Sequence, residues 1–261
     1  MTRRAAPRAR ARGAAAPRHE PARPPPGDRG ARRLDGLDAL RGAALLAMIV
    51  YHFCFDLRYF GVTHWDFEHG SLWILARGSI LSSFLLIAGV SAVLARRAPA
   101  ADAQWLRHVL RVAAAAVLVT LASALMFPQS FIWFGTLHAI AVSLLIARPV
   151  VKYPAVAAVA GAIVIVAGNT LANAAFDGRA LGWLGFMTQK PQTEDYVPIF
   201  PWAGVLLVGV AAGHALAARR WRDFAPPRRA PAWVATLGRH SLVVYLAHQP
   251  LLLAALWAAV A

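Results

Sequence analysis

Residues 37–60 read LDALRGAALLAMIVYHFCFDLRYF. This apolar stretch is as long as the run of about 20 residues that an α-helix needs to cross the hydrocarbon core of a membrane. It also carries four ionisable side chains: Asp38, Arg41, His52 and Asp56. A charge in that core costs about 2.5–3.5 kcal/mol on insertion scales, so such groups almost always face protein or a water-filled cavity. At 100° per residue the four side chains and Tyr59 lie on one side of the helix, which predicts a span with a polar face along its length.

The rest of the chain supports a membrane protein. Of its 261 residues 59% are apolar and only 15% are charged, and the mean hydropathy is +0.51. A soluble domain of this size carries more charge. The predicted fold class is therefore all-α, a polytopic membrane helical bundle with about seven transmembrane helices. We place these spans at residues 37–60, 71–95, 105–127, 131–148, 152–172, 198–218 and 239–260.

Residues 1–33 have a different composition from the rest. They contain ten Arg, two acidic residues and many Ala and Pro, with no apolar run. Such a segment cannot bury enough apolar surface to fold alone. We expect a disordered cytoplasmic tail over 1–33 and a membrane domain over 34–261.

The cations predict the orientation of the bundle. The formal net charge is +15, and most of the 27 Lys and Arg fall in the tail and in alternate loops, all on one side of the predicted bundle. Cytoplasmic loops carry such an excess, so we expect the N-terminus in the cytoplasm and the C-terminus outside. Because the cations lie between apolar spans, we interpret them as contacts to anionic membrane lipid rather than to nucleic acid.

His52 and Asp56 are the strongest catalytic candidates. They are separated by one helical turn, so the carboxylate can bond one ring nitrogen of the imidazole and leave the other free. The result is an oriented general base for an amine or hydroxyl acceptor. The alternative is a structural histidine inside the bundle. His69, near the start of the second span, could reach the outer mouth beside His52.

Two further sets of residues suggest a binding site for an anionic donor at the cytoplasmic end. Asp38 and Arg41 can pair with each other, or Arg41 can face an anionic ligand; it lies about 16 Å along the helix from His52. Arg239 and Ser241 begin the last span, where a helix N-terminus attracts anions.

Other polar groups in the bundle lack a motif of their own. His138, His248, Gln249 and Trp202 are expected to line the substrate path. The long outer loop 173–197 has the length of a lid or binding loop. No HExxH-type set, phosphate-binding loop or CxxC pair occurs, so no metal is implied.

Several short motifs occur in an order that resembles one known family. They are LDALRG (37–42), MIVYHF (48–53), FDL (55–57), FLLIAGVS (84–91), FGTLH (134–138), DYVP (195–198), PW (201–202) and LGRHS (237–241), followed by Tyr245 and His248. Together they resemble the heparan-α-glucosaminide N-acetyltransferase catalytic-domain family, in its compact bacterial form.

The resemblance implies a transmembrane acyltransferase in the bacterial inner membrane. Acetyl-CoA would bind from the cytoplasm, and the acetyl group would pass to an amine or hydroxyl of a sugar of the cell envelope. The lysosomal family member has more spans, and carries an Asn where this chain has His52 and a His near the place of His69. The base is therefore His52, His69 or both, and a homodimer is an open possibility.

In this hypothesis His52 is the base, oriented by Asp56, and Arg41 and Arg239 hold the phosphates of the donor. The acceptor approaches under the loop 173–197. The alternative is a non-enzymatic transporter, whose polar face lines a path for protons or a solute. A small scaffold protein of the membrane is a third interpretation.

Overall fold

The computed structural model describes residues 1–2, 35–96, 100–218 and 231–260. The predicted tail lies almost wholly outside this part of the chain. The described helices of eight or more residues are α1 (Asp35–Tyr59), α2 (Ser71–Ala95), α3 (Ala101–Met126), α4 (Thr136–Val150), α5 (Pro154–Thr170), α7 (Ile199–Ala218), α8 (Ala232–Arg239) and α9 (Ser241–Val260). Two short helical turns, η1 (Ala174–Phe176) and α6 (Arg179–Gly182), lie in the loop between α5 and α7.

The all-α prediction is confirmed: the described residues contain helices and a single isolated bridge, between Phe134 and Tyr196, but no strand. Each of the seven predicted spans corresponds to one helix. Within the described residues, five of them are long and apolar enough to cross a membrane, namely α1, α2, α3, α7 and α9. With 15 and 17 residues, α4 and α5 are shorter than the usual span of about 20. The seven-span count and the sides of the two termini stay predictions.

The outer faces of these helices are apolar. On α3, Leu110, Leu118, Leu121 and Leu125 are each more than half exposed. Soluble monomers rarely expose apolar patches beyond a few hundred Å². A run of leucines along one helix face therefore indicates contact with lipid.

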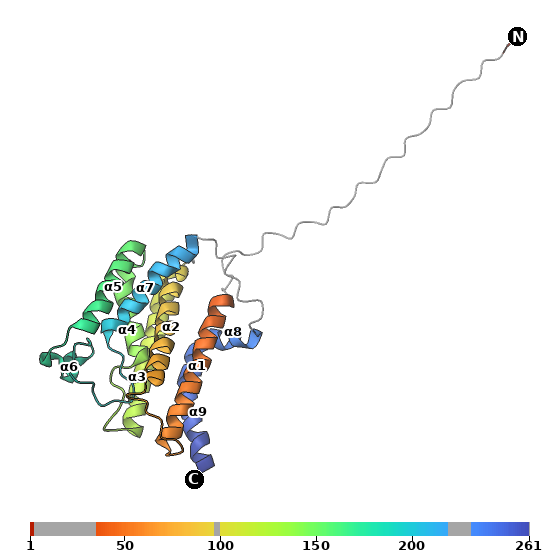
Figure 1. The fold of residues 1–261 in the computed structure, drawn as a ribbon. Coiled ribbons are helices and arrows are strands. Elements are labelled where there is room, and N and C mark those ends of the chain that lie inside the picture. The colour runs from red at the N-terminus through yellow and green to blue at the C-terminus, as the bar shows by residue number, and fades with distance from the viewer. Residues whose placement is uncertain (3–34, 97–99, 219–230, 261) are drawn as a thin grey trace. The chain divides into compact units, whose positions relative to one another are not determined.

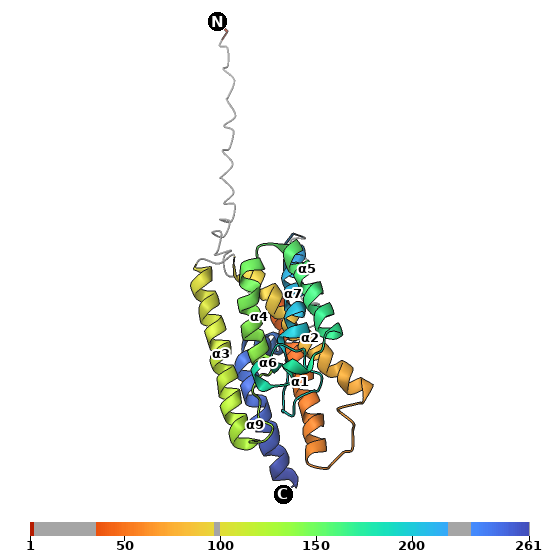
Figure 2. The same ribbon diagram turned by 90° about the vertical axis from the view of Figure 1, so that its left-hand side faces the viewer.

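Small residues bring the central helices into close contact. The helices stand side by side, with α7 next to both α2 and α5 (Figure 1, Figure 2). A Cβ at Gly89 of α2 would lie 2.1 Å from the carbonyl oxygen of Leu206 on α7, so only glycine permits this approach. Small residues at helix interfaces are the usual way to pack helices in lipid, where the hydrophobic effect does not drive association. Leu85, Leu206 and Val210 are fully buried in the resulting core.

The short helix α8 crosses the first turns of α1, as Figure 1 shows. Two glycines make this contact: a Cβ at Gly42 would lie 2.0 Å from Val234 O, and a Cβ at Gly238 would lie 1.8 Å from Asp38 O. The two helix backbones therefore touch without side chains between them. This contact holds α8 against the polar start of α1, where Asp38 and Arg41 lie.

We expect Gly238→Ala to lower the thermal unfolding midpoint of the detergent-solubilised protein, because the new methyl group forces α8 away from α1. Overpacking of this kind costs about 1–3 kcal/mol. Gly78→Ala is the matched control, since no atom lies within 4 Å of the Cβ it adds to α2. That variant should be neutral or slightly stabilising, as alanine favours helix. Equal midpoints for the two variants would contradict this account of the α1–α8 contact.

Candidate functional site

Two polar clusters lie along α1. The proximal cluster, near the start of α1, comprises Asp38, Arg41, Ser91, Thr236, Arg239 and His240. The distal cluster, near its end, comprises His52, Asp56, His248 and Gln249. The predicted polar face of α1 is thus divided between two sites, each completed by residues of other helices.

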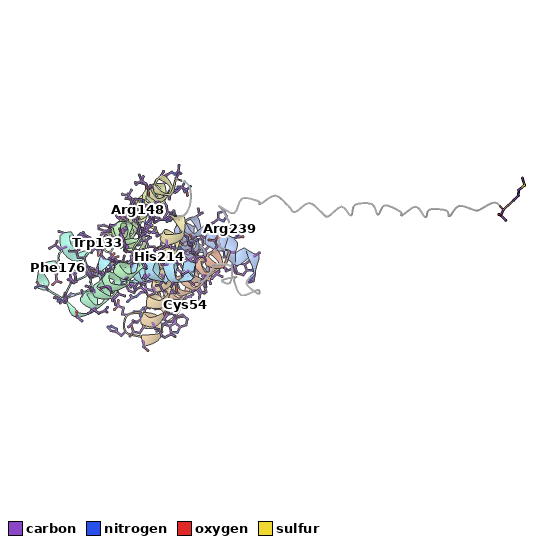
Figure 3. The ribbon with its side chains drawn as sticks, turned by 90° about the horizontal axis from the view of Figure 1, so that it is seen from above. Cys54, Trp133, Arg148, Phe176, His214 and Arg239 are labelled. Carbon is purple, nitrogen blue, oxygen red and sulfur yellow. The ribbon has the colours of Figure 1, made fainter. Side chains whose placement is uncertain are left out.

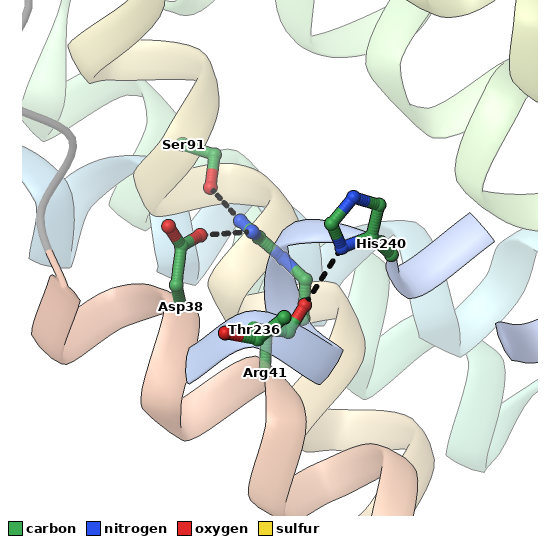
Figure 4. Close-up of polar contacts among 5 residues, drawn as sticks. All are labelled: Asp38, Arg41, Ser91, Thr236 and His240. Carbon is green, nitrogen blue, oxygen red and sulfur yellow. Dashed lines mark hydrogen bonds and ion pairs between the residues drawn. The ribbon is translucent and has the colours of Figure 1, made fainter. Parts of the chain in front are cut away.

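Arg41 is the centre of the proximal cluster. Its Nη1 donates to Asp38 Oδ1 at 2.7 Å, which confirms the ion pair expected from their spacing, and its Nη2 donates to Ser91 Oγ at 2.9 Å (Figure 4). The second carboxylate oxygen of Asp38 is buried and has no hydrogen-bond partner. His108 of α3 also lies close enough to Arg41 to interact electrostatically. The proximal cluster therefore places the cationic Arg41 beside a buried carboxylate that keeps one free acceptor oxygen.

Helix α8 and the start of α9 supply the remaining groups of the proximal cluster. Arg239 Nη2 donates to Thr236 Oγ1 at 2.6 Å, and His240 Nδ1 donates to the Thr236 carbonyl at 3.0 Å. Because α8 touches α1 through Gly238, these groups lie near the start of α1. Ser241 is the first residue of α9, and its role in binding an anion stays a prediction. Together these residues give the proximal cluster an excess of positive charge, which suits an anionic ligand.

The distal cluster lies where α9 packs against α1. Asp56 is only 1% exposed, and its Oδ1 accepts a 2.7 Å hydrogen bond from Gln249 Nε2. The rings of His52 and His248 have their centroids 5.0 Å apart. The hydrogen bond described for Asp56 thus comes from α9, whereas the sequence suggested His52 as its partner. The structure joins two histidines, a carboxylate and an amide from residues about 190 positions apart.

The hydrogen bond of His248 defines its chemistry. Nδ1 lies 2.5 Å from the carbonyl oxygen of Tyr245, so it carries the proton and donates it. In a neutral imidazole the other nitrogen then has a free lone pair. That atom, Nε2, is buried without a partner. A histidine whose tautomer is fixed in this way presents a ready proton acceptor.

Two more atoms of the distal cluster are buried without a partner: Asp56 Oδ2 and Gln249 Oε1. Leaving such groups unpaired costs about 1–3 kcal/mol each. The carbonyl of Leu246 also lacks its usual helical donor, because Pro250, one turn later, has no N–H. Such a concentration of unused acceptors is typical of a site that binds a polar ligand.

A hollow of about 210 Å³ lies beside the end of α1. It is lined by Phe55, Arg58, Tyr59, Phe67 and Glu68. A second hollow of about 460 Å³ lies at the loop between α5 and α7, and its lining includes Trp133, Arg179 and Lys190. In Figure 3, Phe176 of this loop lies at the left edge of the folded part, well apart from Arg239. Both hollows carry aromatic and charged side chains, and either could admit a polar acceptor.

The other predicted residues lie outside the two clusters. His69 is exposed in the loop before α2, with Nδ1 3.5 Å from Asp66 Oδ2, and its role beside His52 stays a prediction. His138 is bonded on both ring nitrogens: Gly135 N donates to Nδ1 at 3.3 Å, and Nε2 lies 3.2 Å from Thr120 Oγ1. That pattern is typical of a structural histidine.

Trp202 of α7 packs against the main core, and its expected place along the substrate path stays a prediction. Among the described residues, no group of three or more His, Cys, Asp or Glu is placed to hold a metal ion.

Ser91 was not predicted as a site residue. It lies on α2, 50 residues from its partner Arg41, and no local pattern marks it. The only signal in the sequence is its position at the end of the motif FLLIAGVS.

Comparison with known proteins gives one match. A family model described as "Heparan-alpha-glucosaminide N-acetyltransferase, catalytic" matches residues 33–250. The match spans every residue of the proximal and distal clusters. Neither the curated proteins nor the solved structures compared with the chain give a match.

We expect Gln249→Leu to destabilise the protein, because Asp56 would lose the hydrogen bond from Gln249 while remaining buried. The loss should be about 1–3 kcal/mol, the usual cost of a buried polar group without its partner. Gln129→Leu, at an exposed loop position, is the control and should change the free energy of unfolding little. Chemical denaturation in detergent measures both. An unchanged midpoint for Gln249→Leu would show that the bond to Asp56 contributes nothing.

Proposed function

The chain belongs to the heparan-alpha-glucosaminide N-acetyltransferase catalytic family, whose members use acetyl-CoA as donor, and we propose that it carries an acetyl group across the membrane to a sugar. In this proposal acetyl-CoA binds from the cytoplasm at the proximal cluster. The acceptor is an amine or hydroxyl of a cell-envelope glycan that reaches the distal cluster from outside. The bacterial inner membrane is the proposed location.

The charge of the proximal cluster supports its role in donor binding. Phosphate groups are recognised by Arg side chains, which bind them in a bidentate manner. Arg41 is held in place by Asp38 and Ser91 and so is oriented before a ligand arrives. The unpartnered Oδ2 of Asp38 can accept a hydrogen bond from an N–H or O–H of the donor. A ligand with both anionic and hydrogen-bond donor groups, as CoA has, fits this combination.

The distal cluster supports a role in proton transfer. When bound, the donor supplies an activated acetyl group as a thioester. The acceptor must lose a proton as its nitrogen or oxygen forms the new bond to the acetyl carbon, while the bond from that carbon to the CoA sulfur breaks and CoA leaves as a thiolate that takes up a proton. His248 Nε2 is a buried lone pair without a partner, and His52 lies beside it, so this pair of imidazoles can take that proton. Asp56 and Gln249 offer acceptor atoms that can orient the incoming group.

The main support for the proposal is the fixed tautomer of His248, because it leaves a buried ring nitrogen with a free lone pair in a helix pair that has two more unpartnered acceptor atoms. The hollow at the end of α1 is lined by Phe55, Arg58 and Tyr59, which lie within one turn of Asp56 along the helix, and in this proposal the sugar ring enters there. Aromatic side chains there offer apolar faces, while Arg58 and Glu68 offer polar contacts.

A transporter is the second candidate. Buried His and Asp groups between spans are also typical of proton pathways. The two functions differ in what they bind: an acetyltransferase of this kind is stabilised by CoA, whereas a transporter moves protons or a solute when placed in liposomes. A thermal shift with CoA, combined with a flux measurement, separates them.

We expect His248→Ala and His52→Ala each to lower the acetyl transfer rate by about 10²–10⁴-fold, the usual contribution of a general base. The assay measures transfer of labelled acetyl from acetyl-CoA to glucosamine-containing envelope glycan by the detergent-solubilised protein. His64→Ala, in the exposed loop after α1, is the control and should keep the wild-type rate.

His69→Ala belongs in the same series. If it alone abolishes transfer while both buried variants remain active, the base lies in the loop and not in the distal cluster.

We expect Arg41→Gln to raise KM for acetyl-CoA about tenfold, because one charge-assisted contact to phosphate is worth about 1.5–3 kcal/mol. The rate at saturating donor should change less, since Arg41 lies far from the distal cluster. Lys152→Gln removes a positive charge from an exposed turn between α4 and α5 and should leave KM unchanged. A KM for Arg41→Gln that matches wild type would remove Arg41 from the donor site.

A further inference from the structure

Asp195 lies in the loop before α7 and holds the start of α4. Its Oδ2 accepts a 2.7 Å hydrogen bond from the backbone N–H of Thr136, the first residue of α4. A Cβ at Gly135 would lie 2.5 Å from the same oxygen, so the carboxylate occupies the space that a side chain there would need. A carboxylate at a helix N-terminus satisfies one of the free N–H groups and complements the helix dipole. Asp195 thus caps a helix from 59 residues away in the sequence.

The backbone around Asp195 is fixed on both sides. Glu194 N donates to Ser130 O at 2.9 Å, and Val197 N donates to Phe134 O at 3.2 Å. The hydroxyl of Thr193 adds a 2.8 Å bond to the carbonyl of Phe131. The segment 193–197 is therefore paired with 130–134, and the carboxylate of Asp195 is held in position. Burial raises the pKa of this carboxyl, while the positive charge of Arg77 acts against that rise.

Thr136 connects this cap to α9. Its side chain interacts with the carboxylate of Asp195 and with the hydroxyl of Tyr245, and the ring of Tyr245 packs against the buried cluster that includes Leu137, the next residue of α4. Tyr245 lies one turn before His248, and its carbonyl receives the bond from His248 Nδ1 that fixes the tautomer. A chain of contacts thus runs from Asp195 through Thr136 and Tyr245 to His248. No residue of the distal cluster belongs to the loop, yet the loop carboxylate is linked through Thr136 and Tyr245 to the turn that bears His248 and Gln249.

We propose that Asp195 is a positioning residue for the distal cluster: through Thr136 and Tyr245 it holds the turn of α9 that presents His248 and Gln249 to α1. The expected effect on kcat rests on the proposed acetyl transfer. The expected effect on the structure of the α9 turn does not. The competing interpretation is a cap that stabilises α4 and affects nothing beyond it. The two differ in whether the change reaches residues 244–250.

The loop also supplies a matched control. Asp177 accepts hydrogen bonds from both the N–H and the hydroxyl of Thr188, at 2.7 and 2.6 Å. Both carboxylates therefore lie in the connection between α5 and α7 and both bind a threonine. Only Asp195 is linked through its threonine to α9. Asp177→Ala removes a comparable contact at an exposed site outside both clusters.

The test compares Asp195→Ala, Asp195→Asn, Tyr245→Phe and Asp177→Ala in the full-length protein in detergent. The first measurement is hydrogen–deuterium exchange of the peptide amides at 244–250, which reports local opening of the α9 turn. Asp195→Ala and Tyr245→Phe should increase exchange there, and Asp177→Ala should not. Asp195→Asn should stay close to wild type, because its amide oxygen can still accept the N–H of Thr136.

The second measurement is acetyl transfer with the assay described above. Asp195→Ala should lower kcat about 10- to 100-fold, the range expected when a catalytic group is misplaced, with KM for acetyl-CoA changed less than about twofold. Asp195→Asn should recover most of that rate. The double variant with Tyr245→Phe should be no slower than Asp195→Ala alone, because both act through one chain of contacts.

Increased exchange confined to 130–137, with 244–250 unchanged, would overturn the proposal in favour of a simple cap. An increase in exchange at 244–250 for Asp177→Ala equal to that for Asp195→Ala would overturn it as well. If the wild-type protein transfers no acetyl group, the proposed function fails, while the exchange measurement still decides whether Asp195 positions the α9 turn.

Discussion

The hydrogen bond from Gln249 to the buried carboxylate of Asp56 is the contact on which the arrangement of α1 and α9 depends. Without the hydrophobic effect to hold helices together in lipid, polar contacts and close packing determine which helices associate. A carboxylate in that environment must find a donor, and α9 supplies it. The same contact brings His248 against His52. The hydrogen bond that gives Asp56 its partner therefore also assembles the distal cluster.

The buried carboxylates at the two ends of α1 have different partners. At the start of the helix, Asp38 and Arg41 neutralise each other, and Ser91 takes a second bond from the guanidinium. Near the end no cation is described in contact with Asp56, and a neutral amide serves instead. This ion pair is neutral, and Arg239 of the same cluster adds a positive charge that suits an anion. A carboxylate with an amide and two imidazoles suits the exchange of a proton.

The sequence predicted the helices well, because apolar length determines them. The span predicted at 71–95 has the same limits as α2, and the others differ by a few residues at one or both ends. The ion pair of Asp38 and Arg41 followed from spacing within one helix. The bonds from Gln249 to Asp56 and from Thr136 to Asp195 could not be predicted in this way, because each joins segments that are 59 or more residues apart. Periodicity describes one helix at a time and says nothing of its neighbour.

By itself, the sequence determined that this protein is a helical membrane bundle, that α1 has a polar face, and that the chain resembles one family. These properties depend on apolar length, on 100° periodicity and on short motifs, all of which are local. Only the tertiary structure decided that the polar face is divided into two clusters, and that the ring of His248 lies beside that of His52. The physical reason is that a buried polar group takes its partner from whichever helix packs against it, and packing is a property of the whole bundle.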